Sequence, residues 1–396
     1  MSDRIPPELV TEILLRSHVH TLQNCRLVSK QWRSIVDDPD FIKRHIDHSI
    51  KTNTNNIFFL QEEDGNLYEL DFDTFGPGGP LKFHDRPEFP GNRSVSLVGS
   101  CNGLLCTRNE NNGDILIINP SMRKHRWMPG FLPVNFQTQV HLDDDDIWIH
   151  GTGYGFGYDR VSGDYKIVRI LQMLGPDNVG YLESEMVICH VKTRVITSVK
   201  MPYLIRSVHK MGVFAGGALH WIMGRYDDLR SRNLIVGYDL GTDEFRELPQ
   251  PEHVNETFRM HIGLLGTCLC MLAYHSEVGT YVWMMKEYGV RQSWTKLFSI
   301  PDNLLHYKSI RPLGFSKKGS EILLELNGKR LVWYDLEKKS VELVRFRGLR
   351  NKYFETILCL RSLVRTDANG GMHETLKSSN IQKGKEWVKS NNNQKR

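Results

Sequence analysis

The sequence has no run of about 18 apolar residues, and its start, MSDRIPPELV, has no apolar stretch of signal-peptide length before its charges begin. It has no C-x-x-C pair, and its seven cysteines are an odd number. These absences argue against a membrane-spanning helix, a secretory leader and a disulfide framework. We therefore expect reduced, mostly buried thiols in a protein of the cytoplasm and nucleus, with no membrane partner.

Positive charge is scarce outside the C-terminal end. The formal net charge is +5, and residues 365–396 alone contain seven Lys or Arg against three Asp or Glu. The nearly neutral remainder lacks the clustered cations that displace counterions from a nucleic acid, so no nucleic-acid partner is expected. Residues 365–396 are polar and low in apolar content, which predicts a disordered basic tail; a nuclear-import signal is the alternative.

Common catalytic and metal-binding motifs are also missing: the chain has no G-x-S-x-G, H-E-x-x-H or P-loop. The glycines of GTGYGFGYD, residues 151–159, are spaced as in a dinucleotide site, but the alternating aromatics predict a β-hairpin instead of a helix start. The run from Asp143 to Asp146 lacks the ligand spacing of a calcium loop, and Cys268 with Cys270 lack a second ligand pair for zinc. We therefore expect no catalytic residues, no metal and no cofactor.

Residues 5–46 have the pattern of short helices, and almost no helical pattern follows them. Pro6 and Pro7 can begin a first helix, where a missing N–H costs nothing, and apolar residues then recur at i, i+4 spacing. Ser29 is placed to cap a third helix, and Asp38 before Pro39 to cap a fourth. About 40 residues are too few to bury their own apolar faces well, so this module must pack against the rest of the chain or against another protein.

A repeated unit follows the helices, made of an apolar strand that ends in a polar residue, a short turn and a second strand. Its polar marker recurs at intervals of 48, 71, 49, 48 and 48 residues, at Asp71, Asn119, His190, Asp239, Glu287 and Asp335. Apolar hairpins such as SCNGLLC and FAGGALHWI lie in the intervals, and four strands in about 48 residues are typical of a propeller blade. The markers predict an all-β propeller of about six blades, in which Asp239 and Asp335 form turns. The late segment FETILCLRSLV is expected to complete the first blade and to leave no exposed edge.

The one interval of 71 residues locates an insertion of about 23 residues in the third unit, and this insertion contains HLDDDDIWIHG. Loops that vary in length carry binding specificity more often than the strands of a repeated core. Two interpretations are open. Either this loop binds a protein substrate through Asp143, Asp144, Asp145, Asp146 and Trp148, or Trp148 begins a blade strand and the acids form a solvated turn.

The N-terminal stretches IPPELVTEILLR and LQNCRLVSKQWRSIVDDPDFIKRH resemble the F-box, the helical module that docks substrate receptors on a Skp1-type adaptor of a cullin ubiquitin ligase. The resemblance implies that the apolar surface of the module packs against the adaptor and, through it, joins cullin. It carries over a set of adaptor-facing and helix-packing residues: Ile5, Pro6, Leu9, Ile13, Leu14, Val28, Trp32 and Ile35. The chain departs from the family at Ser17-His18, where Leu-Pro is usual.

The rest of the chain resembles the F-box-associated domain of plant F-box proteins, a kelch-like domain, in GSCNGLLC, NPSMRKHRWMP, GFGYDRVSGDYKIVRI, GGALHWI, WMMKEYGVRQSWTKLFSI and LVWYDLEKK. We therefore expect a small all-α F-box at 1–48, a linker at 49–56, a kelch-like β-propeller at 57–364 and the tail at 365–396. The resemblance implies a non-catalytic substrate-recognition subunit of an SCF-type E3 ubiquitin ligase. Its protein substrate stays open between immune receptors, pollen-rejection ribonucleases and others. The alternative is a free-standing kelch-type scaffold, or a propeller enzyme, without ligase coupling.

Overall fold

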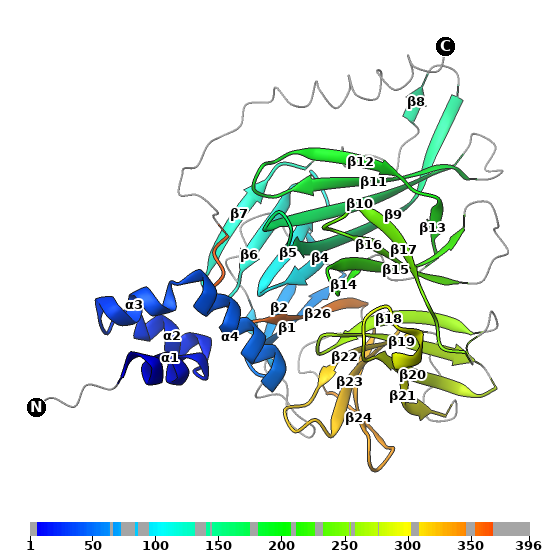
Figure 1. Ribbon diagram of the computed structural model, residues 1–396. Helices are drawn as coiled ribbons and strands as arrows, with labels where there is room; N and C mark the ends of the chain where they lie inside the picture. Colours follow the sequence, from blue (N-terminus) through cyan, green and yellow to red (C-terminus); the bar gives the residue numbers. More distant parts are fainter. Residues whose placement is uncertain are drawn as a thin grey trace, which may run out of the picture.

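The computed structural model describes residues 6–63, 66–72, 84–85, 95–130, 140–142, 145–174, 181–206, 211–225, 233–252, 254, 258–275, 277–301, 309–345 and 353–366. Four helices come first, and six antiparallel sheets follow them around a ring (Figure 1). No helix in the described ranges is long and apolar enough to cross a membrane.

The N-terminal helical module consists of α1 (Pro7–Leu15), α2 (Val19–Cys25), α3 (Lys30–Val36) and α4 (Pro39–Thr52). The predicted helix starts are confirmed: Pro7 is the first residue of α1, the Ser29 side chain accepts a hydrogen bond from the Trp32 N–H, and the Asp38 carboxylate accepts one from the Phe41 N–H. The fourth helix is longer than expected. It continues to Thr52 and ends at Asn53, whose φ of 50° is left-handed. Half of the expected linker, residues 49–52 of 49–56, is therefore helix, and β1 begins at Asn56.

Each of the six sheets is one propeller blade. Blade 1 contains β1 (Asn56–Glu62), β2 (Leu67–Asp71), β3 (His84–Asp85) and β26 (Phe354–Leu360), and blade 2 contains β4 (Val95–Cys101), β5 (Leu104–Asn109), β6 (Ile115–Asn119) and β7 (Lys124–Met128). Blade 3 contains β8 (Val140–Leu142), β9 (Asp145–Asp159), β10 (Asp164–Leu174), β11 (Tyr181–His190) and β12 (Ile196–Lys200). Blade 4 contains β13 (Tyr203–Ile205), β14 (Val213–Ala215), β15 (Ala218–Arg225), β16 (Leu234–Asp239) and β17 (Glu244–Leu248).

Blade 5 contains β18 (Arg259–Leu265), β19 (Cys268–His275), β20 (Gly279–Met285) and β21 (Trp294–Ile300), with the 3-10 turn η2 (Arg291–Ser293) before its last strand. Blade 6 contains β22 (Ile310–Phe315), β23 (Glu321–Leu326), β24 (Arg330–Asp335) and β25 (Val341–Leu343). The predicted six blades are thus confirmed. The marker residues recur because each lies at or just after the end of the strand next to the outermost strand of its blade, which is the third of the four regular strands.

The ring is closed by the two ends of the chain, as the sequence predicts. Strand β26 pairs with β1 from Asn56↔Leu360 to Glu62↔Phe354, so the C-terminal strand is the innermost strand of blade 1. This pairing hydrogen-bonds the edge of β1 that an isolated N-terminal hairpin would expose.

The turns after the third strands use the predicted side-chain acceptors. Asp239 Oδ1 accepts hydrogen bonds from the N–H groups of Gly241 and Thr242, and Asp335 Oδ1 accepts from those of Glu337 and Lys338. The segment 151–159 is likewise the predicted hairpin strand, because it lies in β9 and pairs with β10. An added Cβ at Gly155 would lie 2.8 Å from the Leu219 side chain of blade 4, so a glycine is needed where these two blades approach.

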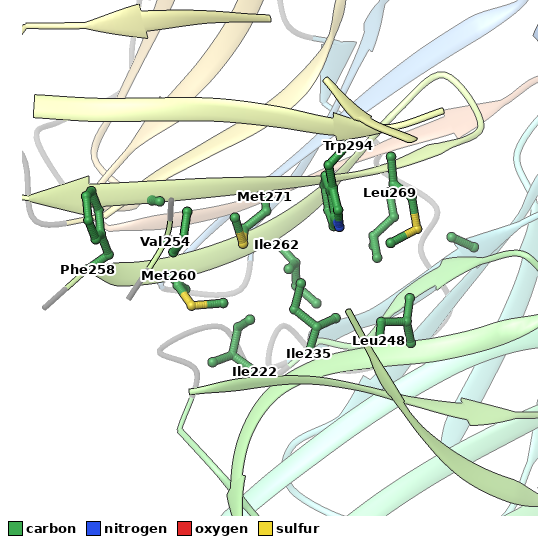
Figure 2. Packing of buried hydrophobic residues seen from close by; sticks show 13 residues of the cluster. Ile222, Ile235, Leu248, Val254, Phe258, Met260, Ile262, Leu269, Met271 and Trp294 are labelled. Atoms are coloured by element: carbon green, nitrogen blue, oxygen red, sulfur yellow. The ribbon is translucent and has the colours of Figure 1, made fainter. Parts of the chain in front are cut away.

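Apolar clusters fill the spaces between neighbouring blades. Figure 2 shows the cluster between blades 4 and 5, where Ile222 and Ile235 face Met260 and Ile262. Six of the seven cysteines are buried, Cys268 is partly buried, and none is in a disulfide, as predicted. Because the strands are covered on both faces by the adjacent blades, the described residues offer binding surfaces at the two open faces of the ring, at its outer rim and on the helical module.

Candidate functional site

The helical module exposes four large apolar side chains. Leu9 and Ile13 of α1 are 55% and 56% exposed, and Leu27 and Val28, in the turn before α3, are 85% and 65% exposed. Single exposed apolar residues are ordinary, whereas four on a module this small form a surface suited to a partner protein. Pro6, at the start of α1, is also exposed.

Other apolar side chains of the module pack against one another. Leu14 is 1% exposed and belongs, with Val10, Leu22 and Phe41, to the apolar cluster of the helices. Trp32 and Ile35 are partly buried against the same cluster. Leu14 is therefore one of the helix-packing members of the predicted set, and Pro6, Leu9, Ile13 and Val28 are its outward-facing members. Ile5 lies outside the described residues.

The unusual Ser17-His18 turn is held by hydrogen bonds instead of a proline. The carbonyl oxygen of Ser17 accepts a hydrogen bond of 2.9 Å from Nε2 of His45, and the His18 side chain accepts one from the His20 N–H at the start of α2. The Val19 N–H donates to Asn55 Oδ1 at 3.1 Å. Burial lowers the pKa of His45 and so favours the neutral imidazole, and the hydrogen bond to the carbonyl places the proton of this neutral ring on Nε2.

The helical module is attached to the propeller at one face of the ring. Nε2 of Gln23 donates to the carbonyl oxygen of Ser121 at 2.7 Å, and Nδ2 of Asn53 donates to the carbonyl oxygens of Phe315 and Ser316 at 3.2 Å. These acceptors lie in the β6–β7 and β22–β23 turns. We call this side the near face; it carries the turns between first and second strands and between third and fourth strands.

Residues 361–366, which we call the closing segment, form part of the same junction. Leu363 is 4% exposed and packs into the apolar cluster of the helices, and Arg365 lies 3.7 Å from Asp37. Nδ2 of Asn119 donates to the carbonyl oxygens of Ser362 and Val364, at 3.0 and 2.7 Å. The closing segment therefore touches both the helices and blade 2.

The opposite side, which we call the far face, carries the connections from one blade to the next. Because strands alternate in direction within a blade, these connections must lie away from the near-face turns. Five of the six are long in sequence, running from Asp85 to Val95, Met128 to Val140, Leu248 to Arg259, Ile300 to Ile310 and Leu343 to Phe354, and the sixth, from Lys200 to Tyr203, is short. Near-face turns such as Cys101 to Leu104, Ala215 to Ala218 and Leu265 to Cys268 are much shorter.

The predicted insertion in blade 3 extends beyond the far face. Strand β9 is 15 residues long, and its first part forms a hairpin with β8 in which Asp145 pairs with Leu142 and Asp146 with His141. The backbone of Trp148 lies within β9, opposite Leu174. Asp143 and Asp144 lie outside the described residues, as does the Trp148 side chain. In Figure 1 this hairpin, at the upper right, is on the other side of the molecule from the helices.

Buried ionisable groups in the ring serve as links between blades. Lys166 of blade 3 is 2% exposed, and its Nζ lies 3.3 Å from Asp159 and 3.0 Å from Asp243 of blade 4. His220 of blade 4 bonds Tyr288 of blade 5. Within the described ranges, no three His, Cys, Asp or Glu side chains are grouped to hold a metal ion.

Sequence reasoning did not identify two parts of these surfaces. Leu27 is the most exposed apolar residue of the module, and the consecutive apolar pair Leu27-Val28 directly before the cap Ser29 was the available signal. The contact of Leu363 with the helices had no local signal, because it depends on how the ends of the chain meet.

Comparisons with known proteins agree with this architecture. The F-box domain family matches residues 2–44, and the F-box associated beta propeller domain family matches residues 78–359. F-box protein CPR1 of Arabidopsis thaliana is 34% identical over 369 residues, which cover 88% of this chain and 86% of that protein. F-box protein At4g22390 of the same plant is 30% identical over 358 residues, covering 85% and 84%, and F-box/kelch-repeat protein At3g23880 is 29% identical over 329 residues, covering 81% and 85%.

Proposed function

Because this chain belongs to the F-box proteins that carry an F-box-associated β-propeller domain, we propose that it is the substrate-recognition subunit of an SCF-type (Skp1-cullin-F-box) E3 ubiquitin ligase. The observation that carries this proposal is the exposed apolar surface of the helical module, formed by Leu9, Ile13, Leu27 and Val28. A Skp1-like adaptor would cover this surface and link the chain to cullin. Ubiquitin transfer belongs to a separate enzyme, and this chain contributes binding only.

We propose further that the protein substrate binds at the far face of the propeller. The near face is partly occupied by the helical module, through Gln23, Asn53 and the closing segment. The far face has the longer connections and the extended β8–β9 hairpin, which are the parts of a propeller that can differ without disturbing the blades. A substrate there would be held away from the adaptor, leaving a gap for the ubiquitin-transferring enzyme. The cytoplasm and nucleus are the proposed location.

The test is co-precipitation of the full chain with a purified Skp1-like adaptor. Leu9→Asp with Ile13→Asp should abolish binding, because a charge placed in an apolar interface must be desolvated without a partner. The control is Val278→Asp, at an apolar residue of the propeller that is 45% exposed, and it should bind normally. Unchanged adaptor binding by the double variant would favour the free-standing scaffold instead.

A further inference from the structure

Two arginine side chains from different blades converge at the far face around one tyrosine. Cζ of Arg108, in blade 2, lies 4.9 Å from the centre of the Tyr154 ring, and Cζ of Arg169, in blade 3, lies 5.5 Å from it. Arg108 is the last but one residue of β5 and pairs with Ser96 near the start of β4, which places it at the far-face end of blade 2. The β8–β9 hairpin rises from the same place, because Tyr154 belongs to β9.

Arg169 and Tyr154 are largely removed from water, and no counter-ion of the arginine pair lies among the residues that the structure describes. Arg169 is 6% exposed and Tyr154 is 7% exposed, while Arg108 is partly exposed. The Nε atoms of both arginines are buried without a hydrogen-bond partner. In the part of the chain that the structure describes, no carboxylate forms an ion pair with either guanidinium group. Buried charges in proteins are normally paired, so a buried Arg169 that shares one tyrosine ring with a second cation, and has no acid partner in the described ranges, is an unusual arrangement that calls for an anion.

The electrostatics agree with this geometry. Burial lowers the pKa of Arg169, and the positive charge of Arg108 acts in the same direction, although an arginine stays charged at neutral pH. Stacking on the Tyr154 ring offsets part of the free energy needed to remove the arginine charge from water, because the ring face attracts cations. It also orients the guanidinium groups, and Arg108, being partly exposed, gives access from solvent at the far face.

We propose that Arg108, Arg169 and Tyr154 form a binding site for a phosphate group. Guanidinium groups match the oxygens of phosphate through paired hydrogen bonds. A phosphate group carries between one and two negative charges at neutral pH and so balances two arginines, whereas a single carboxylate would leave one positive charge uncompensated. The group can come from free phosphate or from a phosphorylated side chain of a bound protein.

The test is thermal unfolding of the full chain during titration with inorganic phosphate, at constant ionic strength maintained with chloride. A ligand that binds only the folded state raises the melting temperature in a saturable way. We expect this rise in the unchanged protein, and an apparent affinity at least tenfold weaker in Arg108→Gln and in Arg169→Gln. Arg259→Gln, at an exposed arginine of blade 5, is the matched control and should keep the full response.

Several outcomes decide the matter. Without phosphate, Arg108→Gln should melt no lower than the unchanged protein, because it removes one of two repelling charges; this variant remains informative if Arg169→Gln fails to fold.

An equal response to phosphate in all variants would mean a general salt effect and would overturn the site. An equal response to acetate would replace phosphate by a carboxylate. A stronger response to O-phosphoserine than to phosphate assigns the site to phosphorylated side chains, and a weaker one assigns it to the free anion. None of these results depends on adaptor binding, so the ligase assignment is tested separately.

Discussion

Arg311 of β22 donates hydrogen bonds to both oxygens of Thr356 in β26, at 2.7 Å to the carbonyl and 2.8 Å to the hydroxyl. The same guanidinium lies 2.6 Å from Glu325 of β23, which is 2% exposed, and the Thr356 hydroxyl also bonds Glu325. The buried Glu325 and Thr356 and the partly buried Arg311 join blade 6 to the C-terminal strand of blade 1. They therefore stabilise the contact between blades 6 and 1, where the ring closes.

Removing one partner of the Arg311–Glu325 ion pair should lower the stability of the protein. Arg311→Met leaves Glu325 charged and unpaired in the interior, and we expect the free energy of unfolding to fall by about 3–5 kcal/mol in a urea titration. The double variant Arg311→Met, Glu325→Leu removes both charges and should recover a large part of that loss. If the single and double variants were equally unstable, the ion pair would not be the reason.

Loss of the closing strand should be more severe. A chain that ends at residue 352 lacks β26 and exposes the edge of β1, so we expect aggregation or no cooperative thermal transition. A chain that ends at residue 366 keeps β26 and the closing segment and should melt like the full chain. Equal behaviour of the two truncations would contradict closure by β26.

Asn119 explains why one marker is an amide where three others are aspartates. Its Oδ1 accepts from the Ser121 and Met122 N–H groups, as Asp239 and Asp335 do in their turns, while its Nδ2 donates to the carbonyl oxygens of Ser362 and Val364. Asn119→Asp keeps the acceptor and loses the donor, so it should loosen the closing segment without unfolding blade 2. Two buried carbonyls would then lack a partner, at about 1–3 kcal/mol each.

Hydrogen exchange provides the measurement for Asn119→Asp. We expect faster exchange in residues 361–366 and in α2, and unchanged exchange in blades 3 to 5. Asp239→Asn, the reverse change in a turn without this second role, is the control and should alter stability by about 0.5 kcal/mol or less. Unchanged exchange at residues 361–366 would show that the two donated bonds do not anchor the segment.

Acid should weaken the junction of blades 4 and 5. Nδ1 of His220 donates to the Val213 carbonyl at 3.0 Å, so Nε2 accepts from the Tyr288 hydroxyl at 2.7 Å and the imidazole must be neutral. Burial lowers the pKa of His220 from 6.5 to about 4. The unfolded chain therefore binds a proton first, and stability present above pH 6.5 is lost as the pH falls toward 4, by about 3 kcal/mol from this group.

The comparison is the free energy of unfolding between pH 7 and pH 4 in His220→Gln and in the unchanged protein. His220→Gln should be less stable at pH 7 and should lose less stability on acidification. His125→Gln, at an exposed histidine of β7, should follow the unchanged protein. A parallel pH dependence in all three would exclude His220 as an important contributor.

Two residues of the helical module should separate folding from binding. Trp32 is partly buried against the helical cluster, and we expect Trp32→Ala to cost the module about 3 kcal/mol and reduce its helical signal in circular dichroism. Leu9 is exposed, so Leu9→Ala should leave stability unchanged and weaken adaptor binding. Isothermal titration calorimetry with the adaptor measures the change in binding affinity. Loss of helical signal in Leu9→Ala would contradict this division.

The β8–β9 hairpin is the predicted substrate contact. Replacing Asp143 to Asp146 with Ser should slow capture of a basic substrate, because clustered acids speed encounter, and Trp148→Ala should speed its release by removing an aromatic anchor. Association and dissociation rates by surface plasmon resonance, once a substrate is in hand, separate these effects. Normal capture by both variants, with an unchanged melting temperature, would favour a solvated turn.

Much of the fold could be predicted because its signals are local or periodic. Ser29 and Asp38 mark helix starts by their own chemistry, and the turn residues Asp239 and Asp335 recur at the blade interval. The division of the helical surface was less predictable. Helical spacing puts Leu14 and Ile13 next to each other on the chain but does not say which one the other helices cover.

Contacts between segments that lie far apart in the chain could not be predicted from the sequence. Arg108 and Arg169 come together only because two adjacent blades present them to the same tyrosine, and no spacing in the sequence encodes that meeting. The same holds for Leu363, which reaches the helices only after the ring has closed. Such contacts follow from the complete fold and not from any single stretch.

The pairing of β26 with β1 also sets the order in which the protein can be completed during translation. The helices are synthesised before the propeller, but Leu363 and Arg365, which contact them, are synthesised after its blades. A chain stopped early by a premature codon would carry an intact adaptor-facing surface beside an open ring. The contacts of Gln23 and Asn53 with the propeller do not need the closing segment, whereas those of Leu363 and Arg365 form only after it has been synthesised, so complete attachment of the helical module depends on a finished propeller.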